Sequence, residues 1–163
     1  MSYRFIGFWS AAAAVCLGLL SCSEKEARQP DSAELPTLQV QLTSLDTELF
    51  ACQTPQEVLR FLEKHPTLAT SFFSELAQMP LPQKAEQLYQ LIQNPALRGF
   101  ERQLDSLFEA EALAQQLEMA FRRVAYYYPG FSPPKVQTIV TGFFGNDLYV
   151  SDSLVIIGLD YFG

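Results

Sequence analysis

The chain has 163 residues, of which 48% are hydrophobic, and its 18 acidic and 11 basic residues give a net charge of −7. An acidic surface repels nucleic acid and anionic lipid headgroups, which excludes charge-driven binding to either. The length allows one domain with a sizeable core and leaves no room for a second large domain.

The N-terminus has the pattern of a lipoprotein signal peptide. Arg4 supplies a positive start, Phe5–Leu20 supplies an apolar core, and Leu19–Cys22 has the form of a lipobox with the small Ser21 at the cleavage position. We predict cleavage after Ser21 and attachment of a diacylglycerol and an acyl chain such as palmitate to Cys22. The alternatives are an uncleaved spanning anchor, which needs about 20 apolar residues, and an ordinary secretory signal.

Cleavage removes residues 1–21, and Arg4 is the one charged residue among them, so the mature chain has 142 residues and a net charge of −8. Of the three cysteines, Cys16 leaves with the signal and Cys22 is lipidated, so Cys52 has no partner for an intramolecular disulfide. The sequence allows Cys52 to be a reactive thiol or a buried apolar side chain, and burial is the commoner role. Stability must then come from an apolar core, and the full sequence offers 13 Phe and 7 Tyr residues, of which Tyr3, Phe5 and Phe8 lie in the predicted signal.

Residues 22–36 are polar and charged, and they form a predicted flexible tether with a reach of about 20 Å. The folded domain is predicted over 37–163. It opens with Leu38–Leu42, where apolar and polar residues alternate as in a half-buried strand. Thr54 and Pro55 then form a helix start, and His65-Pro66 ends that helix.

Further helices are predicted over Thr67–Met79 and Pro82–Gln93, and from Pro95 with an apolar face of Leu97, Phe100, Leu104 and Leu107. The clearest helix is Glu109–Tyr128. Its predicted core face consists of Leu113, Leu117, Phe121, Val124 and Tyr128, with Glu118 and Arg122 as an ion pair on the other side.

Three strands are predicted after the last helix, over Lys135–Thr141, Leu148–Val150 and Leu154–Ile157, because these segments are rich in β-branched residues and separated by turns. Their closeness predicts an antiparallel meander in an α+β fold with a helical N-terminal half. The last strand is apolar throughout, which indicates that it is covered on both faces or lies centrally in the sheet. Because nothing follows it to provide cover, we expect residues 37–163 to be the N-terminal part of a longer domain.

Four segments resemble the gliding-motility lipoprotein family GldB of Bacteroidota, and they occur in the same order: Gln41–Phe50, Val124–Phe131, Pro134–Thr138 and Asp152–Asp160. The resemblance covers most of the mature chain. It implies a lipoprotein of the cell envelope, expected at the outer membrane and facing the periplasm or the surface, with protein partners in the gliding and linked type IX secretion machinery. It also implies chains about twice this length, so this one is expected to be truncated.

The family is similar in architecture to zincin-type zinc peptidases, whose catalytic helix carries His-Glu-x-x-His. That motif needs two histidines on one helix face, and this chain has a single one, His65. His65 is interpreted as a residue at an exposed helix end rather than a metal ligand. We identify no catalytic, cofactor-binding or metal-binding set of residues.

Two further features have competing interpretations. Asp160 follows the last strand and either caps that strand or points into a cleft, and it is the one cleft candidate. Tyr126–Tyr128 either form an aromatic binding platform or pack in the core and at interfaces, which is commoner.

Three functional hypotheses result. The first is a lipid-anchored envelope protein that acts by protein contacts and is not an enzyme. The second is the N-terminal part of a zinc-peptidase-like enzyme whose catalytic helix lies beyond residue 163. The third is an envelope lipoprotein that binds a ligand. The residues encoded after Gly163 would separate the first two, because a His-Glu-x-x-His motif there would favour the enzyme.

Overall fold

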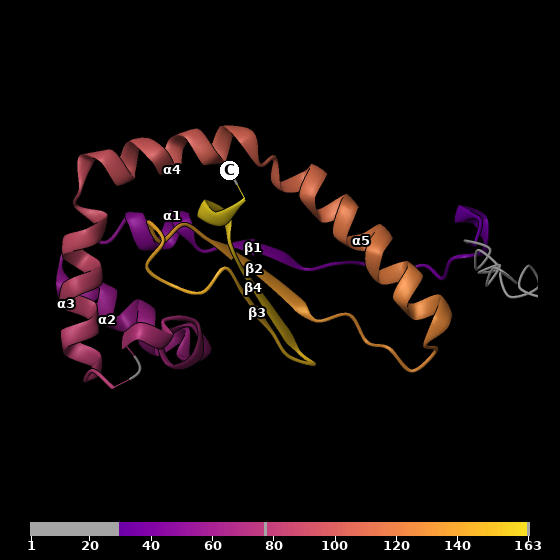
Figure 1. Ribbon diagram of the computed structural model, residues 1–163, viewed down its shortest axis with the longest axis horizontal. Coiled ribbons are helices and arrows are strands. Elements are labelled where there is room, and N and C mark those ends of the chain that lie inside the picture. The colour runs from indigo at the N-terminus through magenta and orange to yellow at the C-terminus, as the bar shows by residue number, and fades with distance from the viewer. Residues whose placement is uncertain (1–29, 77, 163) are drawn as a thin grey trace, which may run out of the picture. The chain divides into compact units, whose positions relative to one another are not determined.

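The computed structural model describes residues 30–76 and 78–162. Contacts divide the chain into Met1–Pro30 and Asp31–Gly163, and all elements below belong to the second unit. Its helices are α1 (Asp46–Phe50), α2 (Pro55–Lys64), α3 (Leu81–Ile92), α4 (Pro95–Leu107) and α5 (Ala110–Tyr127) (Figure 1). Its strands are β1 (Leu42–Ser44), β2 (Lys135–Ile139), β3 (Leu148–Val150) and β4 (Leu154–Gly158). The α+β class is therefore confirmed.

The four strands form one mixed sheet in the order β1-β2-β4-β3. β1, β2 and β4 are parallel, and only β3 is antiparallel to its neighbour β4. The predicted antiparallel meander is therefore wrong. β4 lies between β2 and β3 because an apolar strand is most stable where both edges are paired and both faces are covered. β3 thus forms part of the connection between two parallel strands.

The two faces of the sheet meet different surroundings. Partners in register share a face, so Val136, Thr138 and Val155 lie on one face, whereas Ile139 and Ile156 lie on the other. Ile139 and Ile156 are fully buried in the main core, together with residues of α1–α4. α4 and α5 arch along one side of the sheet in Figure 1, with α2 and α3 grouped at the left.

Local signals place three helices close to their predicted bounds. The Thr54 hydroxyl accepts a hydrogen bond from the Glu57 amide, Pro55 is the first residue of α2, and His65 is its C-cap. α3 and α4 also begin next to prolines, and the Asn94 side chain caps α4. Of the predicted α4 face, Leu97 and Leu104 are buried, but Leu107 is exposed at the end of the helix.

The predicted helix Thr67–Met79 is interrupted. A π-helical turn spans Leu68–Phe72 and a short 3₁₀ turn spans Ser74–Leu76. Phe72 and Phe73 are both fully buried. Adjacent residues point about 100° apart in a regular α-helix, so a break lets both rings enter the core.

The first strand is shifted from the predicted Leu38–Leu42 to Leu42–Ser44. Leu42 pairs with Val136, and the pairing runs to Ser44 opposite Thr138. The strand thus begins where the chain reaches the edge of β2, which alternation along the sequence alone does not reveal.

α5 has its predicted length but not its predicted burial. No residue of the helix is buried, Val124 is exposed, and the side chain of Tyr128 is 68% exposed just after the helix. Arg122 is not in the expected pair with Glu118. Its guanidinium donates hydrogen bonds to the carbonyls of Ser32, Leu35 and Pro36, at 2.9 to 3.3 Å. Residues 31–36, which composition assigns to the tether, are thus held against α5.

Candidate functional site

A pocket lies where the end of α4 and the start of α5 pass over β1 and β2, with a cavity volume of about 70 Å³. Its polar lining comes from four different elements: Ser44, Asp46, Glu101, Asp105 and Thr138. Its apolar lining includes Leu42, Phe108, Leu113, Val140 and Leu159. The pocket is therefore a narrow space with apolar walls and several carboxylates.

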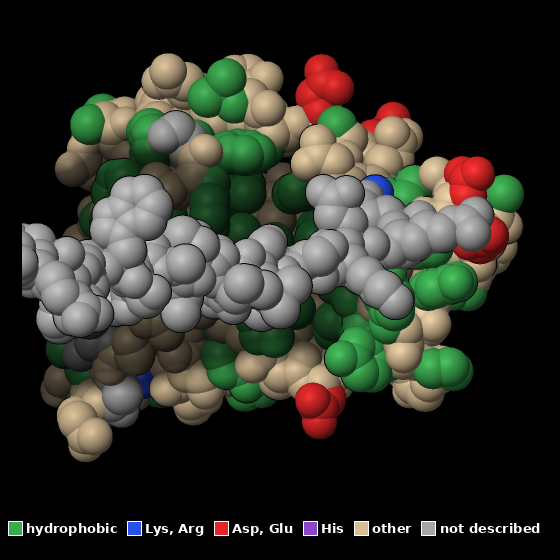
Figure 2. All heavy atoms as spheres, turned by 45° about the vertical axis from the view of Figure 1, so that its right-hand side comes forward, with side chains coloured by type: hydrophobic (Ala, Val, Ile, Leu, Met, Phe, Trp, Pro, Cys, Tyr) green, Lys and Arg blue, Asp and Glu red, His purple; other side chains and the backbone are tan. Residues whose placement is uncertain are grey.

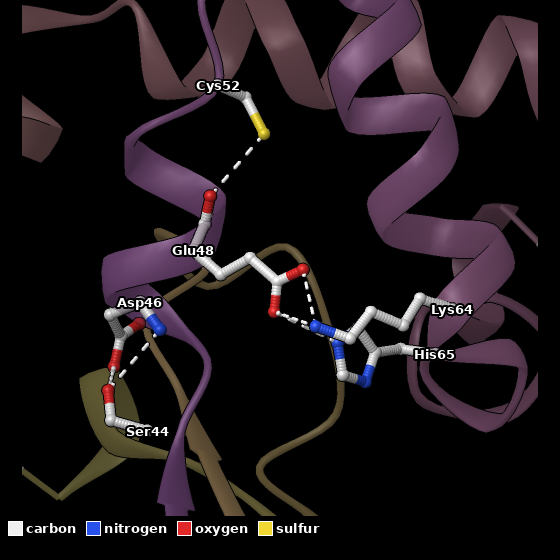
Figure 3. A network of polar contacts seen from close by, with 6 residues as sticks. All are labelled: Ser44, Asp46, Glu48, Cys52, Lys64 and His65. Atoms are coloured by element: carbon white, nitrogen blue, oxygen red, sulfur yellow. Dashed lines mark hydrogen bonds and ion pairs between the residues drawn. The ribbon is translucent and has the colours of Figure 1, made fainter.

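Asp46 is the most constrained of these side chains. It begins α1, directly after β1, and only 8% of it is exposed. One carboxylate oxygen accepts a hydrogen bond from the Val140 amide at 2.5 Å, and the other accepts from the Ser44 hydroxyl at 2.9 Å. Figure 3 shows the Ser44 contact. Asp46 therefore ties the end of β1 to the chain that leaves β2.

Burial raises the pKa of Asp46 to about 6, and the nearby Glu101 carboxylate adds to that rise. The hydrogen bonds from the Val140 amide and the Ser44 hydroxyl oppose it, because they stabilise the charged form. Asp46 is thus an ionised but poorly solvated carboxylate at neutral pH.

Glu101 and Asp105 lie one turn apart on α4, and both line the pocket. Neither forms an ion pair with any residue in the described part of the chain. Like charges spaced four residues apart repel each other on a helix. Together with Asp46 they place three carboxylates around the pocket, and none of the three forms an ion pair within the described ranges.

Asp160 lies after β4, in a short 3₁₀ turn, and is 3% exposed. Its carboxylate accepts hydrogen bonds from the Thr141 amide and hydroxyl, at 3.2 and 3.1 Å, and from the Phe143 amide. These contacts hold a loop in which Gly142 and the non-glycine Phe143 both have positive φ. The observed role is that of a cap, and the cleft role stays a prediction.

The sequence model of the family described as Gliding motility protein GldB matches residues 25–163. The chain belongs to the GldB family. The match covers every described element, and the family is one of gliding motility lipoproteins, which gives this GldB-family protein a membrane-anchored place in the cell envelope. No curated protein and no solved structure matches the chain, so the zincin-like architecture implied by the resemblance has no support.

A second polar network of this GldB-family protein lies at the end of α2 (Figure 3). Lys64 pairs with the Glu48 carboxylate at 2.8 Å, and its hydrogen bond lowers the pKa of Glu48. The His65 ring also faces Glu48, at 3.5 Å, and lies 4.8 Å from the Phe61 ring. His65 is at a helix end as predicted, but it is mostly covered rather than exposed. Across residues 30–76 and 78–162, no three His, Cys, Asp or Glu side chains are arranged to hold a metal ion.

The structure also bears on the predictions for Cys52 and for Tyr126–Tyr128 of this GldB-family chain. Cys52 is buried, as predicted, and burial raises the pKa of its thiol. The rings of Tyr126 and Tyr127 contact each other edge to face, and both residues are exposed, as is Tyr128. The prediction that these rings pack in the core is therefore wrong. Cys22 lies outside the described residues. Within those residues, no helix is both long and apolar enough to cross a membrane.

No pattern in the sequence predicts the pocket. Its residues come from positions between 42 and 159, so no motif spacing connects them. The one local signal is Ser44-x-Asp46 at the end of a strand, a pattern typical of a side chain that bonds its own backbone.

Proposed function

We propose that this GldB-family chain is a lipoprotein attached to the outer membrane through acylated Cys22, and that it acts by protein contacts within the gliding machinery and the linked type IX secretion machinery. The observation that carries the proposal is the family match, which begins at residue 25, directly behind the lipobox Leu19–Cys22. A lipidated cysteine there would place the domain at the membrane surface.

The described surface supports a role in protein contacts. Leu148 and Val150 are exposed on β3, the strand at one edge of the sheet. Exposed apolar side chains on an edge strand are typical of surfaces that bind another protein. Figure 2 shows hydrophobic side chains interspersed with other side chains on the part of one face that is not drawn in grey, and Asp and Glu side chains toward its margin.

The anchor is tested with Cys22→Ala in the bacterium that carries the gene. We expect the variant to lose metabolic labelling by palmitate, to leave the membrane fraction, and to impair spreading of colonies and release of type IX cargo. Cys16→Ala is the matched control, because Cys16 lies within the predicted signal peptide and should keep the label. Labelling that survives Cys22→Ala would contradict the anchor.

The role in protein contacts is tested separately. A photo-crosslinking amino acid in place of the exposed Val150 should capture proteins of the gliding or secretion machinery in living cells. The same amino acid in place of Glu63, which is exposed on α2, is the control. Equal yields at the two positions would contradict a specific contact at β3.

A further inference from the structure

The segment that connects the domain to the proposed anchor is fixed on α5. Residues 32–34 form a 3₁₀ turn that is capped by the Asp31 side chain, and Leu35 beside it is buried. The Arg122 guanidinium donates hydrogen bonds to three carbonyls of this segment, at 2.9 to 3.3 Å. The chain that arrives from Cys22 is therefore held near the end of α5.

This contact shortens the tether that the composition predicts. Ser32 follows Cys22 by ten residues, and an extended chain spans at most about 3.6 Å per residue. An acylated Cys22 would thus be no more than about 36 Å from Ser32, whatever the conformation of the residues between them. The end of α5 is then the part of the domain that the anchor holds nearest to the membrane.

The same end of α5 carries a cluster of exposed aromatic side chains. Tyr126 and Tyr127 are 42% and 53% exposed and contact each other edge to face, and Tyr128 is 68% exposed. Val124 is exposed as well. Consecutive side chains of a helix point about 100° apart, so the three tyrosines are spread around the end of α5. In Figure 1 this end extends beyond the strands of the sheet.

Tyrosine side chains are suited to the boundary between lipid and water. The ring is apolar, the hydroxyl can form hydrogen bonds, and tyrosines are enriched at the level of the headgroups in membrane proteins. The stretch from residue 119 to 146 contains Arg122, Arg123 and Lys135 and no acidic residue. This stretch therefore does not share the acidic excess of the whole chain, which would oppose contact with anionic headgroups.

We propose that the end of α5 lies in the headgroup region of the membrane that holds the acylated Cys22, with the rings of Tyr126–Tyr128 at the boundary between lipid and water. A few interfacial tyrosines bind weakly on their own, but an anchor within reach gives them a high effective concentration at the surface. The inference rests on the proposed lipid anchor. It adds a fixed orientation of the domain, in which α2 and α3, at the other side of Figure 1, face away from the membrane.

The test uses the full acylated protein in phosphatidylcholine vesicles, with acylation verified by mass spectrometry. The one tryptophan of the chain, Trp9, lies in the predicted signal peptide, so Tyr127→Trp introduces a single fluorescent reporter into the mature protein. Phe162→Trp is the matched control, because Phe162 is also aromatic and is 56% exposed. It follows Leu159, which lines the pocket at the start of α5, and the 18 residues of that helix span about 27 Å.

Brominated lipids quench a tryptophan that reaches the acyl boundary. We expect them to quench the reporter at position 127 several-fold more strongly than the reporter at position 162. Arg122→Ala should reduce the quenching at position 127 several-fold, because it releases residues 32–36 from α5. Arg123→Ala removes the neighbouring charge and should change the quenching little, because Arg123 forms no hydrogen bond to that segment within the described ranges.

Three results would overturn the inference. Equal quenching at positions 127 and 162 would show that the end of α5 does not face the lipid preferentially. Equal losses for Arg122→Ala and Arg123→Ala would show that charge, and not the held segment, brings the helix to the membrane. A photo-crosslinking amino acid in place of Tyr127 should label lipid in living cells, and capture of mainly one protein would assign the cluster to a protein contact.

Failure of this inference can be told apart from failure of the proposed anchor. Without acylation of Cys22, mass spectrometry shows no lipid and the protein does not join the vesicles. If the anchor is present but α5 does not dock, the protein joins the vesicles and the reporter at position 127 stays in water, beyond the reach of the brominated lipids.

Discussion

The Asp46→Asn substitution should remove much of the pH dependence of folding stability on the acidic side of neutrality. Burial raises the pKa of Asp46 to about 6 in the folded protein, whereas an unfolded aspartate titrates near about 4. The folded state therefore holds the proton more tightly. The resulting stabilisation is complete below about pH 4 and is lost as the pH rises through about 6. The difference of about two pKa units corresponds to about 3 kcal/mol of unfolding free energy.

Asparagine keeps an acceptor for the Val140 amide but carries no charge at any pH. We therefore expect the variant to gain on the order of 3 kcal/mol relative to the unsubstituted protein between about pH 4 and 7.5. Urea unfolding followed by circular dichroism at several pH values measures this difference. Asp152→Asn, an exposed turn residue, is the control, and parallel stability curves for Asp46→Asn and the unsubstituted protein would refute the reasoning.

Three other substitutions probe the packing and the loops. Gly145→Ala places a Cβ 2.7 Å from a ring carbon of Phe72, and the overpacking should cost about 1 to 3 kcal/mol in urea unfolding; an unchanged midpoint would contradict the contact. Asp160→Ala leaves two loop amides without their acceptor, so thermal unfolding should show a loss of about 1 to 3 kcal/mol, and full stability would argue against the cap. Arg122→Ala should speed amide hydrogen exchange over residues 32–36 with little effect on the core, and equal exchange would show that Arg122 does not hold that segment.

Elements with short-range signals could be predicted from the sequence. The bounds of α2 depend on Thr54, Pro55 and the His65-Pro66 step, all of which act within one helical turn. The position of β3 likewise follows from turn residues on both sides. Such signals operate before any tertiary contact exists, so they are visible in the chain itself.

Burial could be predicted less well, because periodicity identifies an apolar helix face but not what covers it. The face of α5 has the expected spacing, yet Val124 is exposed and Leu113 is only half-buried. In Figure 1, the end of α5 extends beyond the strands of the sheet. How much of the α5 face is covered depends on where distant elements of the fold end. The local residue pattern does not contain that information.

Strand order and the pocket depend on contacts far apart in the sequence. The apolar sequence of β4 favours cover on both faces or a central position, but its insertion between β2 and β3 depends on competition among all the strands for paired edges. Asp46, Glu101 and Thr138 meet only because β1, α4 and β2 converge. No spacing of residues along the sequence predicts that these side chains come together, so the candidate site could be identified only from the structure.

The strand order also determines when the sheet of this protein can form. β1 has no neighbour until β2 is available, and the Asp46 contact that joins them closes a loop of 94 residues. Closing such a loop is slow, and β2 lacks its second neighbour until β4 has followed. The sheet of a chain exported in the way proposed here would thus form only after nearly all of the described domain had crossed the membrane, whereas the neighbouring helices α2 and α3 can pack on each other earlier. The sheet topology would then make completion of the fold a late event, in the compartment where the protein works.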